Sequence, residues 1–345
     1  MKHPSPVKTA TRPFPDRVAD LHPVEYRLCD FVYFSQRQYD CLDYDPFHPL
    51  LWYMGKGMSV EEHLWLSTLY MAWYNIGSAW VAFNNCDVLK LPPVWTAKIP
   101  VGTQRRNLRG GRVLQHLEDF IRQAKKAGSI RKLLTARFFG NVADDWGALT
   151  HNVGSVWGNG RWSTYTASEL YQKVNRLPVL PTDIMNEGSS GPRTGLCFMH
   201  GVETPHGVKV VPKLDTLARR FYHTVKPYIE TKIPYLPKGH YDLGMVESQL
   251  CDFNSLRKGR YYIGRDIDRD QDRVRSTHMS LARMRLSHQI KHLDDVWEAR
   301  AAVFDKKYLG EYSGWSGRTE YALRHYLRTG EVADHMEIRQ RLGYL

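Results

Sequence analysis

The stretch SVEEHLWLSTLYMAWYNIGSAWVAFNNCD, residues 59–87, carries the strongest fold signal in the chain. Ser59 and Glu62 form an S-x-x-E capping box, which predicts a helix that begins near Val60. After Glu62 the stretch contains no charged residue until its last position, and it is long enough to span a bilayer. Its polar residues and tryptophans are scattered along the whole length, however, instead of gathering at two interfaces. We therefore expect a buried core helix that bends or ends near Gly77.

Helical patterns continue beyond this stretch. Apolar residues recur at i, i+3, i+4 and i+7 over residues 111–127, which predicts an amphipathic helix. Shorter helical segments are expected near 130–139, 142–153 and 164–175. Residues 178–237 are rich in Pro and Gly, so we expect a loop-rich insertion there, with regular helix only around 214–225. The predicted fold class is mostly α.

The C-terminal part adds one departure from the helical pattern. The run Tyr261-Tyr262-Ile263 follows a turn and is typical of a strand, so we expect a short strand pair. Helix is expected to resume from about Thr277. Before it, four Asp residues alternate over 266–272 as at the start of a calcium loop, but the turn Gly and the final Glu are missing. A solvated, salt-bridged turn is the favoured interpretation, with a weak divalent-cation site as the alternative.

The composition indicates a folded, basic protein. In 345 residues, 48 Lys and Arg stand against 36 Asp and Glu, which gives a formal net charge of +12, and 42% of the residues are hydrophobic. We expect residues 1–20 to form a mobile basic arm and residues 21–345 to form a single helical domain. The excess charge favours nucleic acid as a partner, although an ordinary basic enzyme has the same balance. Aromatic residues beside the basic clusters would provide flat surfaces for a base lifted from a duplex. They are Trp162, Tyr165, Tyr261 and Tyr262.

Cysteine spacing and the N-terminal sequence point to the cytoplasm. The five cysteines form no CxxC pair and no zinc or iron–sulfur spacing, so a reducing compartment is expected. No apolar run follows the charged N-terminus, which excludes a secretory signal peptide. The chain also contains no phosphate-binding G-x-x-x-x-G-K-[ST] motif and no G-x-G-x-x-G motif, which argues against a P-loop ATPase and a dinucleotide-binding enzyme.

One short motif suggests contact with a phosphate. In VWGNGRWS, residues 156–163, a G-x-G turn lies between two expected helices. Backbone N–H groups exposed at such a turn can bind a DNA phosphate, as a helix N-terminus does. An ordinary glycine turn is the competing interpretation. The basic composition favours phosphate binding. The candidate DNA-binding residues are Gly158, Gly160, Arg161, Trp162 and Ser163.

The densest group of reactive residues lies between residues 247 and 266. If 243–251 is helical, Glu247 and Cys251 share one face. A carboxylate there could deprotonate a nucleophile while Arg257, Lys258 and Arg260 bind a phosphoryl leaving group. Alternatively, Glu247 forms a structural ion pair and Cys251 fills the core. Spacing alone favours this second interpretation.

Three segments together resemble a known family. The segments VESQLCDFNSLRKGRYYIGRDID (246–268), NEGSSGPRTGL (186–196) and VWGNGRWST (156–164) resemble the phage amino acid:DNA transferases, once called alpha-glutamyl/putrescinyl thymine pyrophosphorylases, over roughly residues 60–320. The resemblance implies a relative of the helix-hairpin-helix DNA glycosylases, with the hairpin in residues 130–176 and a loop-rich catalytic part in 178–275.

The resemblance also implies a reaction. The amine of an amino acid or polyamine attacks the pyrophosphorylated 5-hydroxymethyl group of a deoxyuridine in double-stranded phage DNA, inside the infected host, and pyrophosphate leaves. For this chemistry the candidate bases are Glu247 and Asp252, near Cys251, and Asp183 and Glu187 are candidates to hold the donor ammonium. Arg193, Arg257 and Lys258 are the candidate pyrophosphate ligands. No cofactor and no resident metal are predicted, and a divalent ion assisting pyrophosphate remains an open alternative.

Two other functions compete with the transferase. A base-excising glycosylase places a catalytic Asp or Lys shortly after the hairpin, and Asp183 follows Gly160 at a tolerable spacing. A non-catalytic DNA-binding or packaging protein of a phage would need only the basic clusters.

Overall fold

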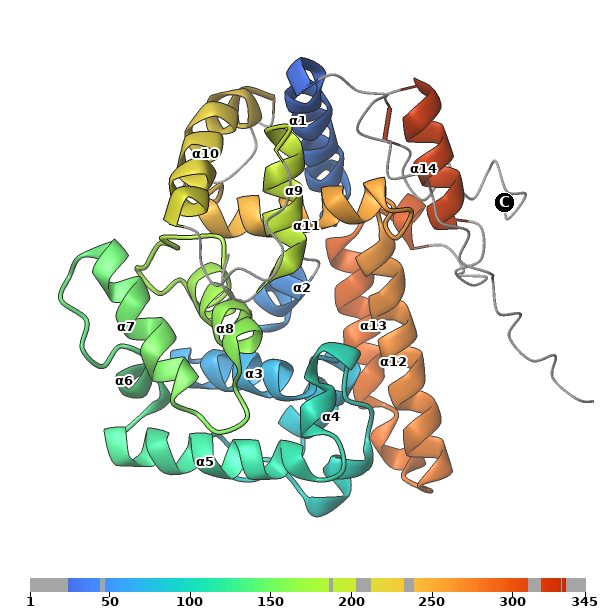
Figure 1. The fold of residues 1–345 in the computed structure, drawn as a ribbon. Helices are drawn as coiled ribbons and strands as arrows, with labels where there is room; N and C mark the ends of the chain where they lie inside the picture. Colours follow the sequence, from blue (N-terminus) through green and yellow to red (C-terminus); the bar gives the residue numbers. More distant parts are fainter. Residues whose placement is uncertain are drawn as a thin grey trace, which may run out of the picture.

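The computed structural model is mostly helical, as the sequence predicts, and it describes residues 24–43, 47–185, 189–202, 212–232, 239–309, 318–329 and 331–332 (Figure 1). The proposed N-terminal arm, residues 1–20, lies outside the described residues. In chain order the helices are α1 (Val24–Cys41), α2 (Phe47–Met54), α3 (Val60–Trp73), α4 (Ile76–Phe83), α5 (Arg112–Ala127), α6 (Ile130–Leu134), α7 (Val142–Gly154), α8 (Arg161–Lys173), α9 (Ser190–Met199), α10 (Pro212–Lys232), α11 (Leu243–Arg257), α12 (Arg265–Arg283), α13 (His292–Val303) and α14 (Arg318–Thr329). Short 3-10 segments are η2 (Val94–Lys98), η3 (Thr103–Leu108), η4 (Ser287–Gln289) and η5 (Lys306–Tyr308).

The capping box predicted at the start of α3 is present. Ser59 Oγ accepts the N–H of Glu62, and the Glu62 carboxylate accepts the N–H of Ser59 at 2.7 Å. Every residue from Leu64 to Trp73 is buried, so α3 is the expected core helix. The break comes at Tyr74, which adopts the left-handed conformation with φ 46°, and a second helix, α4, follows. No helix in the described part of the chain is long and apolar enough to cross a membrane.

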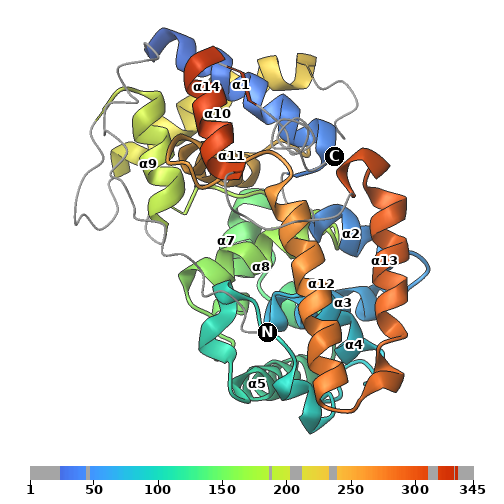
Figure 2. The same ribbon diagram turned by 90° about the vertical axis from the view of Figure 1, so that its right-hand side faces the viewer.

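Two hydrophobic cores organise the helices. The first core is built mainly by α2 to α8 and α13, and the second by α1, α9, α10, α11 and α14. Helix α12 joins them, because Ile267 at its start belongs to the second core while Val274 and Leu281 belong to the first. Figure 2 shows α12 beside α13, reaching from one group of helices to the other. The two cores meet where α8 and α12 approach α11.

The expected loop-rich insertion is more helical than its composition suggests. Helices α9 and α10 occupy much of it, and the end of the Gly-rich stretch, from Ser190, forms the first turn of α9. Gly195 lets α9 approach α11 closely, since a Cβ there would lie 2.4 Å from the carbonyl oxygen of Leu250. Packing against α11, and not intrinsic helix propensity, therefore stabilises this segment.

One expectation at the start of α12 is wrong, and another is not confirmed. Residues 266–272 form the first two turns of α12 and not a salt-bridged turn, so helix resumes earlier than Thr277. The predicted strand pair is absent from the described residues, where Ile263 alone forms an isolated bridge. Tyr261 and Tyr262 are fully buried in the second core, so they offer no surface on which a base could stack.

Candidate functional site

Helix α11 carries the densest group of candidate residues. Asp242 caps this helix, because its Oδ1 accepts the N–H of Met245 at 3.1 Å. Glu247 and Cys251 lie one turn apart on the same face, as their spacing predicts. Glu247 is 9% exposed, and the side chain of Asp252 is 16% exposed. The helix therefore brings two carboxylates into its interfaces with neighbouring helices.

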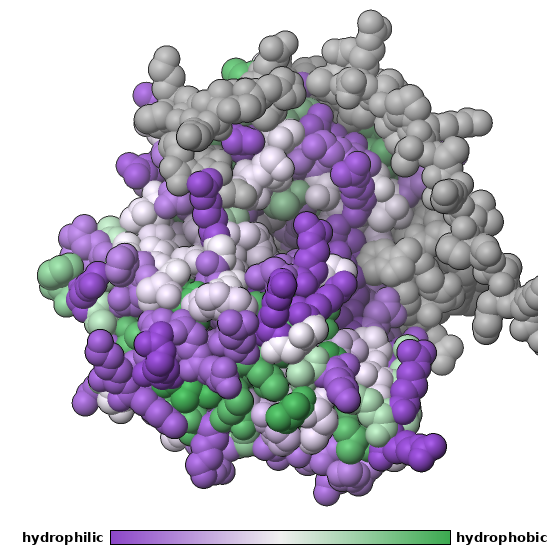
Figure 3. All heavy atoms as spheres, turned by 60° about the horizontal axis from the view of Figure 1, so that its bottom comes forward, coloured by the Kyte–Doolittle hydropathy of each residue, from purple (hydrophilic) through white to green (hydrophobic). Residues whose placement is uncertain are grey.

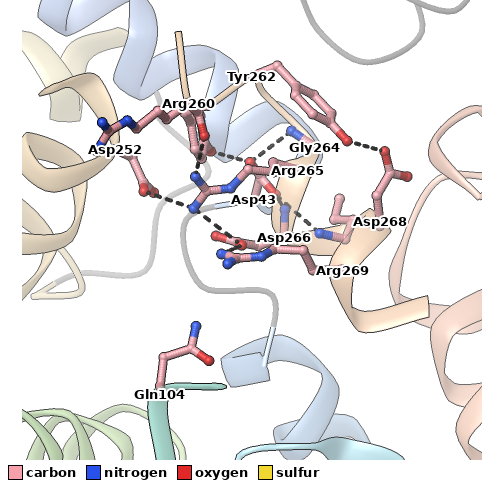
Figure 4. A network of polar contacts seen from close by, with 12 residues as sticks. Asp43, Gln104, Asp252, Arg260, Tyr262, Gly264, Arg265, Asp266, Asp268 and Arg269 are labelled. Atoms are coloured by element: carbon pink, nitrogen blue, oxygen red, sulfur yellow. Dashed lines mark hydrogen bonds and ion pairs between the residues drawn. The ribbon is translucent and has the colours of Figure 1, made fainter. Parts of the chain in front are cut away.

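Asp252 belongs to a polar network between α11 and the first turn of α12 (Figure 4). Arg265 Nη2 lies 3.7 Å from Asp252 Oδ1 and 3.5 Å from Asp266 Oδ1. Arg269, one turn along α12, donates to Asp266 at 3.0 Å. Figure 4 shows the side chain of Gln104 in η3 pointing toward this network from the opposite side. Cations and carboxylates thus alternate at the junction of the two cores.

Asp43 anchors the network from the end of α1. Its carboxylate accepts the backbone N–H groups of Gly264 at 2.8 Å, Asp266 at 3.0 Å and Ile267 at 3.4 Å, and the hydroxyl of Tyr261 donates to it as well. A buried carboxylate therefore caps α12 from a distant segment, where the N-terminal N–H groups favour negative charge. Asp43 is absent from the candidates found in the sequence, because nothing local marks it.

The carboxylates of the network differ in acidity. Burial raises the pKa of Asp252 to about 7, although Arg265 and a hydrogen bond from Gln38 act in the opposite direction. Burial acts the same way on Asp266, but Arg265 and Arg269 lower its pKa to about 2. Near neutral pH, Asp252 exchanges a proton while Asp266 stays ionised. A carboxyl group whose pKa lies near the working pH is well suited to accept a proton.

A second group of carboxylates lies where α8 meets the N-terminus of α11. Tyr165 in α8 is buried, and burial together with nearby carboxylates raises its pKa well above the usual value. The carboxylates that contribute are those of Glu169, Glu247, Asp183 and Asp242, a group we call the acidic seam. Lys173 pairs with Asp242 at 2.5 Å and is itself buried. Four carboxylates near Tyr165, of which Asp242 is paired with Lys173, make the seam attractive to a positively charged ligand.

Two members of the acidic seam, Asp242 and Glu169, are absent from the candidates found in the sequence. Glu169 lies in an ordinary amphipathic helix pattern, where a Glu is usually solvated, yet it is only 3% exposed. A Cβ on Gly244 would come within 2.8 Å of Glu169 Oε1, so the carboxylate sits against the backbone at the start of α11. Only the packing of α8 against α11 reveals this position.

The other carboxylate and thiol candidates, Asp183 and Cys251, are held in place by contacts with neighbouring residues. Asp183 Oδ1 accepts the N–H of Met185 at 2.7 Å, and burial raises the pKa of Asp183. Cys251 Sγ would lie 2.5 Å from a Cβ on Gly191, so the thiol fills the contact between α9 and α11. Burial and the nearby Glu247 raise the pKa of Cys251, which keeps it a thiol and not a thiolate.

The candidate cations are less closely gathered than expected. Arg257 stacks over Phe198 with 4.2 Å between its guanidinium carbon and the ring centroid. Lys258 is exposed, and partial burial together with neighbouring cations lowers its pKa. Arg193 is half-buried in the first turns of α9, and Glu187 lies outside the described residues. The guanidinium groups that the structure does place beside Asp252 are those of Arg265 and Arg269.

The G-x-G motif joins α7 and α8, the helices that the sequence predicts on either side of it, and these two helices pack against each other. Gly158 has φ +86°, and a Cβ there would lie 2.9 Å from Leu108, so its α-carbon faces the protein. Gly160 is exposed, and Ser163, which is buried, accepts its N–H at 2.9 Å. Arg161 is exposed at the N-terminus of α8. The outward-facing part of the motif is therefore Gly160 and Arg161.

Exposed cations lie on the helices beside this turn. Gln123 in α5 donates to the carbonyl of Ser155 at 3.2 Å, which fixes α5 next to the hairpin. The exposed cations on α5, α6 and α8 are Arg112, Arg122, Lys125, Lys126, Arg131, Lys132 and Arg161. Figure 3 brings the α4 and α5 end of the molecule forward and shows hydrophilic side chains around an apolar area. Trp162 is half-buried and meets Tyr74 edge-on at 5.1 Å.

Two surface hollows are lined by other residues. One, of about 670 Å³, is lined by residues from Val94 to Val101 and from Arg109 to Gly111, and the other, of about 450 Å³, lies by the end of α1 and η5. Neither is lined by a candidate residue, so we place the site by its chemistry and not by cavity size. In the described segments, no group of three or more His, Cys, Asp or Glu side chains is arranged to hold a metal ion.

Part of the sequence is similar to a known family. Residues 98–262 match the family model described as amino acid:DNA transferase. The matched region contains the hairpin, α9 and α11, and it ends just before the first turn of α12. No curated protein matches the sequence.

Proposed function

This chain belongs to the amino acid:DNA transferase family, and on that premise we propose that it modifies a base of double-stranded phage DNA. The proposed acceptor is a deoxyuridine whose 5-hydroxymethyl group carries pyrophosphate, and the donor is the amine of an amino acid or polyamine. The enzyme would act in the cytoplasm of an infected bacterium, on a base turned out of the duplex.

The reaction exchanges one bond for another at the 5-methylene carbon. The carbon–oxygen bond to pyrophosphate breaks, the carbon–nitrogen bond to the amine forms, and the ammonium loses a proton to a protein base. Such a step needs cations near the departing oxygens and a carboxylate near the incoming nitrogen. The observation that carries the proposal is that α11, inside the matched region, borders both the acidic seam and the Asp252–Arg265 network.

The acidic seam suits the donor. Its four carboxylates would attract the ammonium. One of them, Glu247, also lies near Cys251. We assign Glu247 as the base, with Asp252 as the second candidate because burial raises its pKa to about 7. Asp183 would help to hold the ammonium. The pyrophosphate would be bound by Arg193, Arg257 and Lys258.

The hairpin suits the DNA backbone. Gly160 and Arg161 are exposed at the N-terminus of α8, where the helix dipole favours an anion, and α5, which carries further exposed cations, contacts the same turn through Gln123 and Asp119. We propose that a DNA phosphate docks there, in a helix-hairpin-helix arrangement like that of the DNA glycosylases.

The test is a product analysis. The protein is incubated with DNA containing pyrophosphorylated 5-hydroxymethyluracil and a panel of amino acids and polyamines, and the nucleosides are then examined by mass spectrometry. A mass increase on the modified nucleoside with release of pyrophosphate supports the proposal. Abasic sites without an aminated product would identify a glycosylase, and unchanged DNA that is nevertheless bound would identify a non-catalytic DNA-binding protein.

A further inference from the structure

A buried arginine lies directly beneath the G-x-G turn. Arg105 in η3 is 1% exposed, although three other arginines of its cluster, Arg106, Arg109 and Arg112, are exposed. Its Nη1 donates to the carbonyl oxygen of Gly158 at 3.1 Å, and the exposed Asn107 donates to the same oxygen at 3.1 Å. The guanidinium is thus aimed at the turn from inside the protein.

The second partner of Arg105 is a neutral histidine. Burial and the charge of Arg105 lower the pKa of His116 to about 4. Its Nδ1–H donates to the carbonyl of Trp157, which leaves Nε2 as an acceptor for Arg105 Nη2 at 3.4 Å. The two residues therefore hold consecutive carbonyl groups of the turn, and neither contributes a negative charge.

No carboxylate in the described residues forms an ion pair with Arg105, and its Nε has no hydrogen-bond partner among them. Asp119 accepts the N–H of Trp157 at 2.8 Å on the same turn, but Arg122 pairs with Asp119. A buried cation with no counter-charge is unfavourable unless something else compensates it. The exposed residues at the turn, Trp157, Gly160, Arg161 and Asn107, supply no carboxylate.

We propose that Arg105 supplies, from beneath the turn, positive charge that holds a DNA phosphate at the hairpin. The inference rests on the proposed contact between the hairpin and DNA. The carbonyl groups of Trp157 and Gly158 accept hydrogen bonds from His116 and Arg105 and therefore point inward. The outward side of the turn is then left to face an anion, which the positive charge of Arg105 attracts. Because this charge lies in the low-dielectric interior, solvent ions screen it less than they screen Arg161.

The experiment measures binding of a short fluorescein-labelled duplex by anisotropy over a series of salt concentrations. Arg105→Gln removes the charge, and Arg105→Lys retains it. Arg105→Gln is expected to weaken binding about tenfold or more and to reduce the salt slope by up to about 0.9. Arg105→Lys is expected to retain most of the affinity and most of the salt slope. Equal affinity and slope in a folded Arg105→Gln protein, or equal losses in the Gln and Lys variants, would overturn the proposal.

A surface variant covers the case in which Arg105→Gln does not fold. Asn107→Asp places a carboxylate beside the same carbonyl group and should neutralise the charge of Arg105. The control is Gln115→Glu, which adds the same charge at an exposed position of α5. Asn107→Asp is expected to weaken DNA binding more than this control does. Equal effects of these two changes would contradict the role of Arg105. If Arg161→Gln also leaves binding unchanged, the hairpin does not contact DNA and the proposed function loses its interface. If Arg161→Gln alone weakens binding, only the role of Arg105 fails.

Discussion

Asp252 and Asp266 share one guanidinium: Arg265 Nη2 lies 3.7 Å from the first carboxylate and 3.5 Å from the second. The shared cation lowers the pKa of both groups, yet burial still raises that of Asp252 to about 7. Arg265 thus controls how readily Asp252 exchanges its proton near neutral pH.

Arg265→Gln is expected to raise the pKa of Asp252 further, because the main lowering influence is lost. If ionised Asp252 takes part in the reaction, the pH at which kcat/KM begins to rise should move upward. The measurement is a pH–rate profile of wild type and variant, with Arg275→Gln, an exposed position of the same helix, as control. An unchanged profile in a folded Arg265→Gln protein would show that the ionisation of Asp252 does not govern activity.

Glu247→Gln should remove most transferase activity and preserve DNA binding, because Gln keeps the shape but cannot accept the amine proton. The expected loss is in the ~10²–10⁴-fold range of general-base catalysis. Turnover is measured with saturating donor, and Asp183→Asn is the matched carboxylate variant. If Asp183→Asn is inactive while Glu247→Gln turns over normally, the base lies outside α11.

Binding to duplex DNA should weaken steeply with salt, with log K falling by about 0.9 for each phosphate neutralised. Gly160→Ala and Arg161→Ala should each reduce affinity without unfolding the protein, since Gly160 has φ −99° and a Cβ there meets no atom within 4 Å. Circular dichroism checks the fold. Unchanged affinity in both variants would return the motif to a simple turn between helices.

Stability should fall on acidification because of buried histidines. Burial lowers the pKa of His116 and of His240 to about 4, below their unfolded value near 6.5. The unfolded chain therefore binds more protons between about pH 6.5 and pH 4, and each histidine removes up to about 1.4 kcal/mol of unfolding free energy per pH unit there. Asp252 acts in the opposite direction, since its folded pKa is raised.

Urea unfolding at pH 7 and pH 5 isolates the histidine contribution. His240→Gln, which removes one of these groups, should lose less stability between the two pH values than wild type does. Identical losses in the two proteins would mean that His240 is not neutral in the folded state.

Removing one partner of the buried pair between Asp270 and Arg300 should be costly. Both side chains are at most 2% exposed, and the pair joins α12 to α13. Asp270→Asn would leave a buried guanidinium uncompensated, for which about 3–5 kcal/mol is typical. The exposed pair of Glu320 and Arg324 provides the control, since Glu320→Gln should cost less than about 1 kcal/mol. Similar losses from the two changes would contradict this account.

Local signals were sufficient for much of the helical framework. The capping box at Ser59 and the apolar periodicity of α5 depend on neighbours within two turns, so they can be read from the chain itself. The same holds for Glu247 and Cys251, whose shared face follows from their spacing once α11 forms. The basic composition favoured nucleic acid as a partner, and the resemblance to the family rested on three short segments.

Only the three-dimensional packing shows which polar groups are buried and which partners they contact. Asp43 caps a helix 221 residues further along the chain, and Glu169 and Arg105 belong to sequence patterns in which exposed charges are the rule. The strand predicted at Tyr261 and the turn predicted at Asp266 fail for the same reason, because the packing of α1, α11 and α12 determines their conformation. Burial and ion pairing depend on contacts between segments far apart in sequence, and the periodicity of a single segment does not encode them.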